Sequence, residues 1–229
     1  MIAAVIVAAG RGQRMGGDQP KQLLPIGGKP ILMHTLTVFL SFGNIDTIIL
    51  VIPQNWIDTI QSLLSSQDSV AKDIRLVAGG DRRQASVYNG LQAIDAQEGI
   101  VLIHDGVRPM VTHGLIEACI QGAQEWGACI PALSVNDTLK RVDNQARVES
   151  TVDRKNLRLA QTPQAFDLSL IRGAHQQAAA EGWQVTDDAS LIEALGRKVK
   201  VIPGIAENFK ITTPQDLQLA EILLKINKS

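Results

Sequence analysis

The chain opens with Ile2-Ala3-Ala4-Val5-Ile6-Val7-Ala8-Ala9-Gly10-Arg11-Gly12-Gln13-Arg14-Met15-Gly16, the most informative stretch of the sequence. Its first part is a continuous apolar run that predicts a buried strand. Its second part interleaves glycines with arginines, so the backbone can approach a ligand closely and its N–H groups can bind an anion. Because ligands of open α/β sheets bind beyond the carboxyl ends of strands, we expect a binding site at this turn.

Apolar, β-branched runs recur along the chain and alternate with amphipathic segments. They predict strands at residues 2–8, 47–52, 74–78, 100–104 and 128–133. Helices are expected to begin near Pro30, Pro53, Arg82 and Thr112. Continuous apolar strands separated by helices are typical of a parallel sheet covered on both faces, so we predict an α/β fold with a mostly parallel central sheet.

The alternation breaks at residues 135–158, which are polar and charged and include the turn signal Asp143-Asn144. We expect an extended hairpin arm here, with a disordered insert as the alternative. Helices should follow near Asp167 and Asp187, a strand at 199–202, and a last helix with Thr213 as its N-cap. We therefore predict one domain over residues 1–229 that carries an inserted arm at about 135–158.

The composition is that of an ordinary globular protein, with 45% hydrophobic and 20% charged residues among 229. Its 22 basic and 23 acidic side chains nearly cancel, which argues against nucleic acid or an anionic membrane as a partner. The two cysteines, Cys119 and Cys129, lie in apolar runs and favour inert core thiols. With no signal peptide and no apolar run near the ~20 residues of a membrane span, we expect a cytoplasmic protein.

The first turn does not fit two well-known phosphate motifs. No glycine is followed at the required spacing by Gly-Lys-Ser/Thr, so a P-loop is excluded. The dinucleotide fingerprint needs a glycine where Met15 stands, and Pro20 and Pro25 oppose an immediate helix. What remains is a loop with Arg11, Arg14 and Lys21, which we interpret as a triphosphate cradle. None of the four histidines has metal-ligand spacing, so we expect no protein-held metal site.

Five blocks of sequence together resemble one enzyme family. Ala8-Ala9-Gly10-x-Gly12-x-Arg14-Met15 followed by Pro20-Lys21-Gln22 is similar to the signature of sugar nucleotidyltransferases. The blocks at 79–87, 104–109, 151–154 and 207–212 resemble the 2-C-methyl-D-erythritol 4-phosphate cytidylyltransferase family, in order and at similar spacing. The chain departs from several relatives at Gly106-Val107 and at Glu207, a longer carboxylate than the aspartate some relatives have.

The resemblance implies a Rossmann-like nucleotidyltransferase fold, a homodimer formed by the arm, and Mg²⁺ carried mainly by the phosphates of CTP. It implies that CTP and 2-C-methyl-D-erythritol 4-phosphate are joined, with release of pyrophosphate, in non-mevalonate isoprenoid synthesis. Since the attacking phosphate is already an anion, the chemistry needs cations that hold and stabilise phosphates rather than a general base.

The resemblance also suggests residue roles, which we state as expectations. The catalytic cations are Arg14, Lys21, Arg154 and Lys210. The CTP-binding residues are Ala8, Ala9, Gly10, Gly12, Gly80, Asp81 and Ser86. The acceptor-binding residues are Asp105, Arg108, Thr138, Thr162 and Glu207. Arg154 and Thr138 are expected to reach the site of the other subunit.

Three alternatives stay open at this point. The first keeps the chemistry and changes the acceptor to ribitol 5-phosphate. The second is a dinucleotide-binding oxidoreductase, which the spacing of the glycines disfavours. The third is a nucleotide-sensing module without turnover, which would not need the cations Arg14, Lys21 and Lys210 together.

Overall fold

The computed structural model describes residues 1–10, 20–65 and 73–226. Within them, eight strands form one sheet in the order β10-β7-β11-β6-β1-β4-β5, and β12, which lies off this path, also pairs with β7. The strands of this sheet are β1 (Ile2–Val7), β4 (Thr47–Ile52), β5 (Asp73–Ala78), β6 (Ile100–Asp105), β7 (Ala128–Ser134), β10 (Arg158–Ala160), β11 (Gln164–Asp167) and β12 (Lys200–Pro203). The predicted α/β class is confirmed, since β6, β1, β4 and β5 pair in parallel.

Two strands that the sequence did not predict make the sheet mixed. β11 runs antiparallel between β6 and β7, and β10 runs antiparallel to β7. Both are short and carry polar residues such as Arg158 and Gln164, so they lack the continuous apolar run that identified the other strands. A small hairpin of β2 (Pro25–Ile26) and β3 (Lys29–Pro30) also forms, and the sequence did not predict it.

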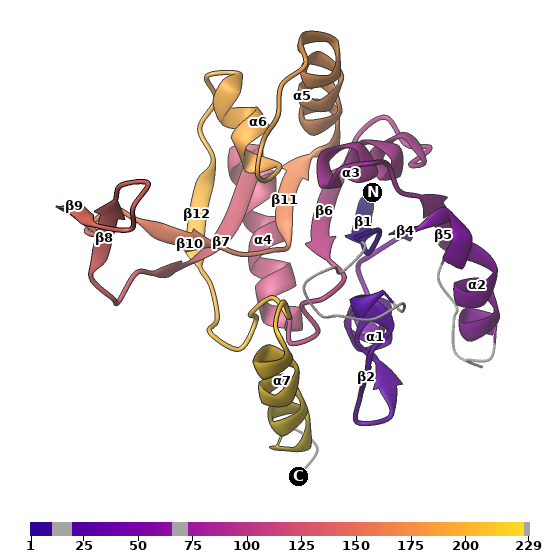
Figure 1. The fold of residues 1–229 in the computed structure, drawn as a ribbon. Helices are drawn as coiled ribbons and strands as arrows, with labels where there is room; N and C mark the ends of the chain where they lie inside the picture. The colour runs from indigo at the N-terminus through magenta and orange to yellow at the C-terminus, as the bar shows by residue number, and fades with distance from the viewer. Residues whose placement is uncertain (11–19, 66–72, 227–229) are drawn as a thin grey trace.

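Helices cover both faces of the sheet, as Figure 1 shows. The first face carries α1 (Ile31–Ser41), α2 (Ile57–Ser65) and α4 (His113–Trp126), which pack in one apolar cluster with Ala4, Ile6 and Leu102. The second face carries α3 (Arg83–Gln92), α5 (Leu168–Glu181) and α6 (Ala189–Ala194), which pack with Ala3 and Val5. Alternate residues of β1 thus enter opposite cores, because successive side chains of a strand point to opposite faces.

The helix starts agree with the sequence to within a few residues. Thr112 and Asp167 cap α4 and α5 by accepting from the backbone N–H groups of Leu115 and Leu170. Pro30 directly precedes α1, whereas Pro53 precedes a 3₁₀ turn, η3 (Gln54–Trp56), before α2 begins. The last helix, α7 (Pro214–Ile226), begins at its proline as predicted, and it packs with β2 in a third apolar cluster.

An antiparallel hairpin occupies the polar stretch after β7. Its strands are β8 (Leu139–Val142) and β9 (Val148–Val152), and the side chain of Asp143 accepts from the N–H groups of Gln145 and Arg147 in the connecting turn. Figure 1 shows this hairpin projecting from the end of the sheet opposite β5 and α2. The assignment of residues 1–229 to one domain, and the role of the arm, stay predictions.

Gly90 shows how closely α3, on the second face, packs against the sheet. A Cβ at Gly90 of α3 would come within 2.6 Å of Val5 Cγ1 and 2.9 Å of Val51 Cγ2. Gly173 of α5 is a matched contrast, because a Cβ there would meet nothing within 4 Å. The absence of a side chain at Gly90 therefore brings α3 against β1 and β4.

We predict that Gly90→Ala lowers the free energy of unfolding by about 1–3 kcal/mol, because overpacking outweighs the gain in helix propensity. Gly173→Ala should instead be neutral or stabilising by up to about 1 kcal/mol, since only the propensity changes. Urea unfolding of both variants measures the difference. Equal effects at the two positions would show that α3 does not lie tightly on the strands.

Candidate active site

A cleft of about 1320 Å³ lies beyond the carboxyl ends of β1, β4, β5 and β6. The strand order places it at the position where the chain, after adding β4 and β5 on one side of β1, crosses to β6 on the other. Such switch points are the usual ligand sites of open α/β sheets. The sequence-predicted residues that line it are Ala8, Ala9, Gly10, Lys21, Gly80, Asp81, Ser86, Asp105 and Lys210.

The loop after β1 is anchored at its first residue. The N–H of Ala8 donates to Val51 O at 2.7 Å, and the buried side-chain amide of Gln22 donates to the carbonyl of Ala8. Gln22 thereby joins the segment before α1 to the end of β1. Gly12 and Arg14 lie outside the described residues.

The turn between β5 and α3 approaches the β1 loop very closely. A Cβ at Gly79 would come within 2.2 Å of Ala9 Cβ, so only glycine fits there without displacing the loop. Ser86 holds this turn from inside, because its hydroxyl accepts from Gly80 N at 3.1 Å and donates to Arg82 O at 3.0 Å. The buried Ser86 thus shapes the wall of the cleft through the backbone of Gly80.

Asp105, the last residue of β6, is surrounded by three cations. Its Oδ1 lies 3.2 Å from Arg83 Nε, and its Oδ2 lies 3.0 Å from Lys210 Nζ and 3.4 Å from Arg108 Nε. Burial alone would raise the pKa of this carboxyl, but the charges of Arg83, Lys210 and Arg108 outweigh it and hold the pKa well below the usual range. Asp105 therefore stays ionised and orients cations rather than moving protons.

Two lysines from opposite ends of the chain meet at the cleft. Lys21 Nζ donates to Ile211 O at 3.0 Å, next to Lys210, and both lysines line the cleft. The segment that carries Lys210 is held by the backbone bond from Ile211 N to Val107 O, 3.0 Å long. The fold therefore brings together two of the predicted catalytic cations, which are 189 positions apart in the printed sequence.

Thr162 lies behind Asp105 rather than in the cleft. Its hydroxyl accepts from Asp105 N at 3.1 Å and is 3.1 Å from His104 Nδ1, while His104 Nε2 is 3.1 Å from Arg108 O. Since Arg108 O can only accept, His104 carries its proton on Nε2 and accepts from Thr162 at Nδ1. Burial lowers the pKa of His104 to about 4, so its ring is neutral at pH 7.

Among the described residues, five predicted ones do not line the cleft of their own chain, namely Arg108, Thr138, Arg154, Thr162 and Glu207. Thr138 and Arg154 are exposed on the arm, where the Arg154 guanidinium donates to Asn136 O. Glu207 is exposed beside the buried Asn208, whose carbonyl accepts from Arg108 Nη1 at 2.8 Å.

Sequence reasoning missed three residues that the geometry makes important. Gln22 and Arg83 stood inside recognised blocks, but no spacing rule gave either of them a function. Asp188, which pairs with Arg83 at 2.7 Å, follows α5 and carries no motif at all. Its position becomes apparent only when α3, α5 and α6 pack together on one face of the sheet.

Comparison with known proteins gives a consistent result over the whole chain. Residues 2–226 match the family described as IspD, 2-C-methyl-D-erythritol 4-phosphate cytidylyltransferase. A protein of that name from Syntrophotalea carbinolica is 47% identical over 224 residues, which cover 97% of this chain and 96% of the relative. One from Syntrophus aciditrophicus is 43% identical over 224 residues, covering 98% and 96%.

The fold has close counterparts among solved structures. The crystal structure of 4-diphosphocytidyl-2C-methyl-D-erythritol synthase from Anaerococcus prevotii is similar with a TM-score of 0.85 and 38% identity. The match covers 98% of each chain, so it includes the sheet, both helical layers and the arm.

The neutral, buried His104 predicts a specific dependence of stability on pH. An unfolded histidine binds a proton below about pH 6.5, but the folded one does so only near pH 4, so stability falls as the pH drops through this window. We expect the loss of unfolding free energy between pH 7 and pH 5 to be about 2 kcal/mol larger in the wild type than in His104→Gln. Urea unfolding at both pH values measures it, and equal losses would contradict the assignment.

Proposed function

The chain belongs to the 2-C-methyl-D-erythritol 4-phosphate cytidylyltransferase family, and from this premise we propose that its cleft holds CTP beside the acceptor phosphate. The reaction joins CTP and 2-C-methyl-D-erythritol 4-phosphate to 4-diphosphocytidyl-2-C-methyl-D-erythritol and releases pyrophosphate. The observation that carries the proposal is the meeting of Lys21 and Lys210 at the switch point of the sheet.

The chemistry follows from these charges. A phosphate oxygen of the acceptor attacks the α-phosphorus of CTP, and the bond from that phosphorus to the bridging oxygen of pyrophosphate breaks. The nucleophile is already an anion, so the protein must bring two anions together and stabilise the charge of the transition state. We propose that Lys21 binds the triphosphate and that Lys210, which pairs with Asp105, binds the acceptor phosphate, because both lysines line the cleft.

The nucleotide base is proposed to lie between the β1 loop and the β5–α3 turn. Ala8, Ala9 and Gly10 form one wall of the cleft there, and Gly80 and Asp81 form the other. The close approach of Gly79 to Ala9 and the hydrogen bonds of Ser86 keep this wall rigid. A rigid wall favours tighter binding, since less conformational freedom is lost when the nucleotide binds.

We propose that Mg²⁺ accompanies CTP, held mainly by its phosphates. Within residues 1–10, 20–65 and 73–226 no group of three or more His, Cys, Asp and Glu side chains is arranged to hold a metal ion. Asp105, which lines the cleft, already accepts from three cations. This fits an ion that uses phosphate and water oxygens, as Mg²⁺ often does, and that supplies neutralisation of the triphosphate charge.

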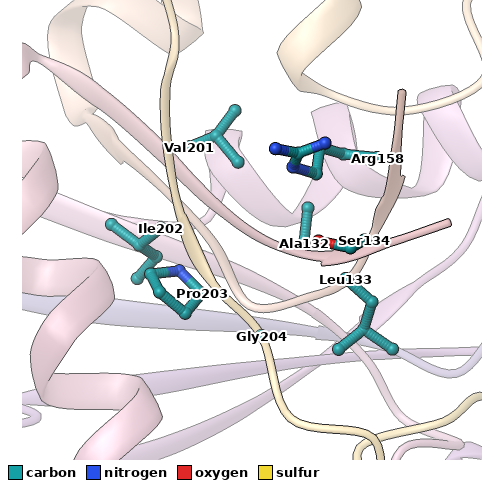
Figure 2. Close-up of a pocket in the computed structure, with 8 residues that line it drawn as sticks. All are labelled: Ala132, Leu133, Ser134, Arg158, Val201, Ile202, Pro203 and Gly204. Carbon is teal, nitrogen blue, oxygen red and sulfur yellow. The ribbon is translucent and has the colours of Figure 1, made fainter. Parts of the chain in front are cut away.

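We propose a homodimer built by the arm. Large apolar side chains around it are 37% to 62% exposed, namely Val142, Val148, Leu157, Leu159 and Val201. A groove of about 470 Å³ lies at its base, where Figure 2 shows Val201 and Arg158 close to Ala132. Exposed apolar surface of this kind favours a protein partner, and a second copy would also bring Arg154 and Thr138 towards a cleft.

The proposed compartment is the cytoplasm. Cys119 and Cys129 are both buried, and neither forms a disulfide. Burial raises the pKa of the Cys129 thiol to about 11, which makes it unreactive at neutral pH. In the described part of the chain no helix combines the length and the hydrophobicity needed to cross a membrane.

The first test is pyrophosphate release with CTP and Mg²⁺, comparing 2-C-methyl-D-erythritol 4-phosphate with ribitol 5-phosphate. We expect release with the first acceptor and at most a trace with the second. Release only with ribitol 5-phosphate would support the proposed mechanism but show that the acceptor is ribitol 5-phosphate. No release with either acceptor would leave a nucleotide-binding module, and titration with NADH would then test the oxidoreductase.

We predict that Arg154→Ala and Lys21→Ala proteins restore activity to each other. Lys21→Ala alone should lower kcat roughly 10²–10³-fold, as the loss of one charge-stabilising donor does. If Arg154 acts in the cleft of its partner, a mixed dimer has one site with both residues intact. An equal mixture should then recover about a quarter of wild-type activity, because about half the dimers are mixed and each has one complete site.

The mixture is assayed after subunit exchange has been verified by a mass-tagged copy of one variant. Activity no greater than the sum of the two separate variants would exclude a site shared between subunits. Unmixed wild-type protein, carried through the same exchange step, controls for losses during handling.

A further inference from the structure

Asp188 is a buried carboxylate that does not line the cleft. Its side chain is 1% exposed, and it stands directly before α6. Oδ2 accepts from Arg83 Nη1 at 2.7 Å, and Oδ1 accepts from His175 Nε2 at 3.1 Å. Because a buried charge is costly without partners, Asp188 and Arg83 must stay paired in the folded protein.

Arg83 connects this buried carboxylate with the one in the cleft. Its Nη1 is held by Asp188, and its Nε donates to Asp105 Oδ1 at 3.2 Å. A guanidinium is planar and presents its donors in a fixed fork, so a fixed Nη1 also fixes the direction of Nε. The orientation of Asp105 therefore depends on a residue at the start of α6.

The orientation of Asp105 in turn affects Lys210 and Arg108, the two cations on the proposed acceptor side. With Oδ1 held by Arg83, Oδ2 faces Lys210 Nζ at 3.0 Å and Arg108 Nε at 3.4 Å. If the Asp105 carboxylate rotated, Oδ2 would move, and the ammonium group of Lys210 that pairs with it would move too. The row of charges thus runs from Asp188 through Arg83 and Asp105 to Lys210.

We propose that Asp188 is a positioning residue for the reaction, acting through Arg83 and Asp105 to hold Lys210 against the acceptor phosphate. This inference rests on the proposed function of the cleft. Asp188 has no surface toward the substrates, so its whole effect on turnover is indirect.

His175 completes the arrangement from behind. It is 1% exposed on α5 and stacks on Tyr88 of α3, with ring centroids 6.0 Å apart and planes 11° apart. Its Nδ1 has no hydrogen-bond partner within the described residues, and its Nε2 contacts Asp188. The His175 ring orients Oδ1 of Asp188 and leaves Oδ2 to accept from Arg83.

A purely structural role, joining α3, α5 and α6, is the competing explanation. The two roles differ in what they do to folded enzyme, because a structural role changes stability and leaves the kinetics of each folded molecule intact. Asp187 provides a matched control. It is the neighbouring residue at the same helix start and accepts from Gln164 Nε2 at 2.7 Å and Ser190 Oγ at 2.6 Å, but it is not joined to Arg83.

The experiment compares Asp188→Asn with Asp187→Asn in steady-state assays of pyrophosphate release, after the wild-type protein has been shown to turn over. We expect Asp188→Asn to lower kcat/KM for the acceptor about 10- to 100-fold, as sub-ångström misplacement of a reacting group does. Its KM for CTP should stay within about twofold of wild type, since the triphosphate cations are not in this row. Asp187→Asn should keep kcat/KM for the acceptor within about twofold, whatever its unfolding midpoint.

A double-mutant cycle tests the route through Arg83. If Asp188 acts only by holding Arg83, then Asp188→Asn should add nothing to Arg83→Gln, and the double variant should match Arg83→Gln in kcat/KM. This comparison remains usable if Asp188→Asn alone fails to fold, because the double variant removes both members of the buried pair.

Three outcomes would overturn the proposal: a folded Asp188→Asn enzyme with wild-type kcat/KM, equal losses in Asp187→Asn, or additive losses in the cycle. Lack of turnover in the wild-type enzyme would instead contradict the proposed function. The two failures are therefore distinguishable.

Discussion

The parallel register of β6, β1, β4 and β5 is the constraint on which the rest of the structure depends. Val7 pairs with Val51 on one side and with Asp105 on the other, and Val51 pairs with Val77, so these strands end level with one another. Loops from four distant parts of the chain must therefore leave the sheet at one edge. The cleft, its glycine turns and its cations are consequences of that alignment.

Electrostatic interactions then decide which charged side chains are stable at the carboxyl ends of these strands. A carboxylate at the end of β6 is buried, so Asp105 is stable as an anion only because Arg83, Arg108 and Lys210 surround it. The same carboxylate offsets the mutual repulsion of these cations before any phosphate binds. An enzyme that must gather two anionic substrates can thus keep its cations close together in the empty site.

Much of the fold was predictable because its signals are local. The strands β1, β4, β6 and β7 are largely apolar runs, and Thr112 and Thr213 mark helix starts by their capping chemistry. The short antiparallel strands β10 and β11 were missed, because pairing with β7 rather than their own apolar content makes them strands. The resemblance of the motifs to a known family suggested Lys21, Asp105 and Lys210 as site residues, and the structure shows that all three line the cleft.

The sequence alone predicted the class of fold and located a glycine-rich stretch after the first strand, since both signals lie in consecutive positions, and the family motifs pointed to the set of basic residues. The folded structure was needed to show that Thr162 supports Asp105 from behind, that Ser86 binds the turn of Gly80, and that Asp188 pairs with Arg83. These contacts join residues on different elements and depend on how α3 and α6 pack on the sheet. Packing is a property of all the layers together, so no local pattern in the chain encodes it.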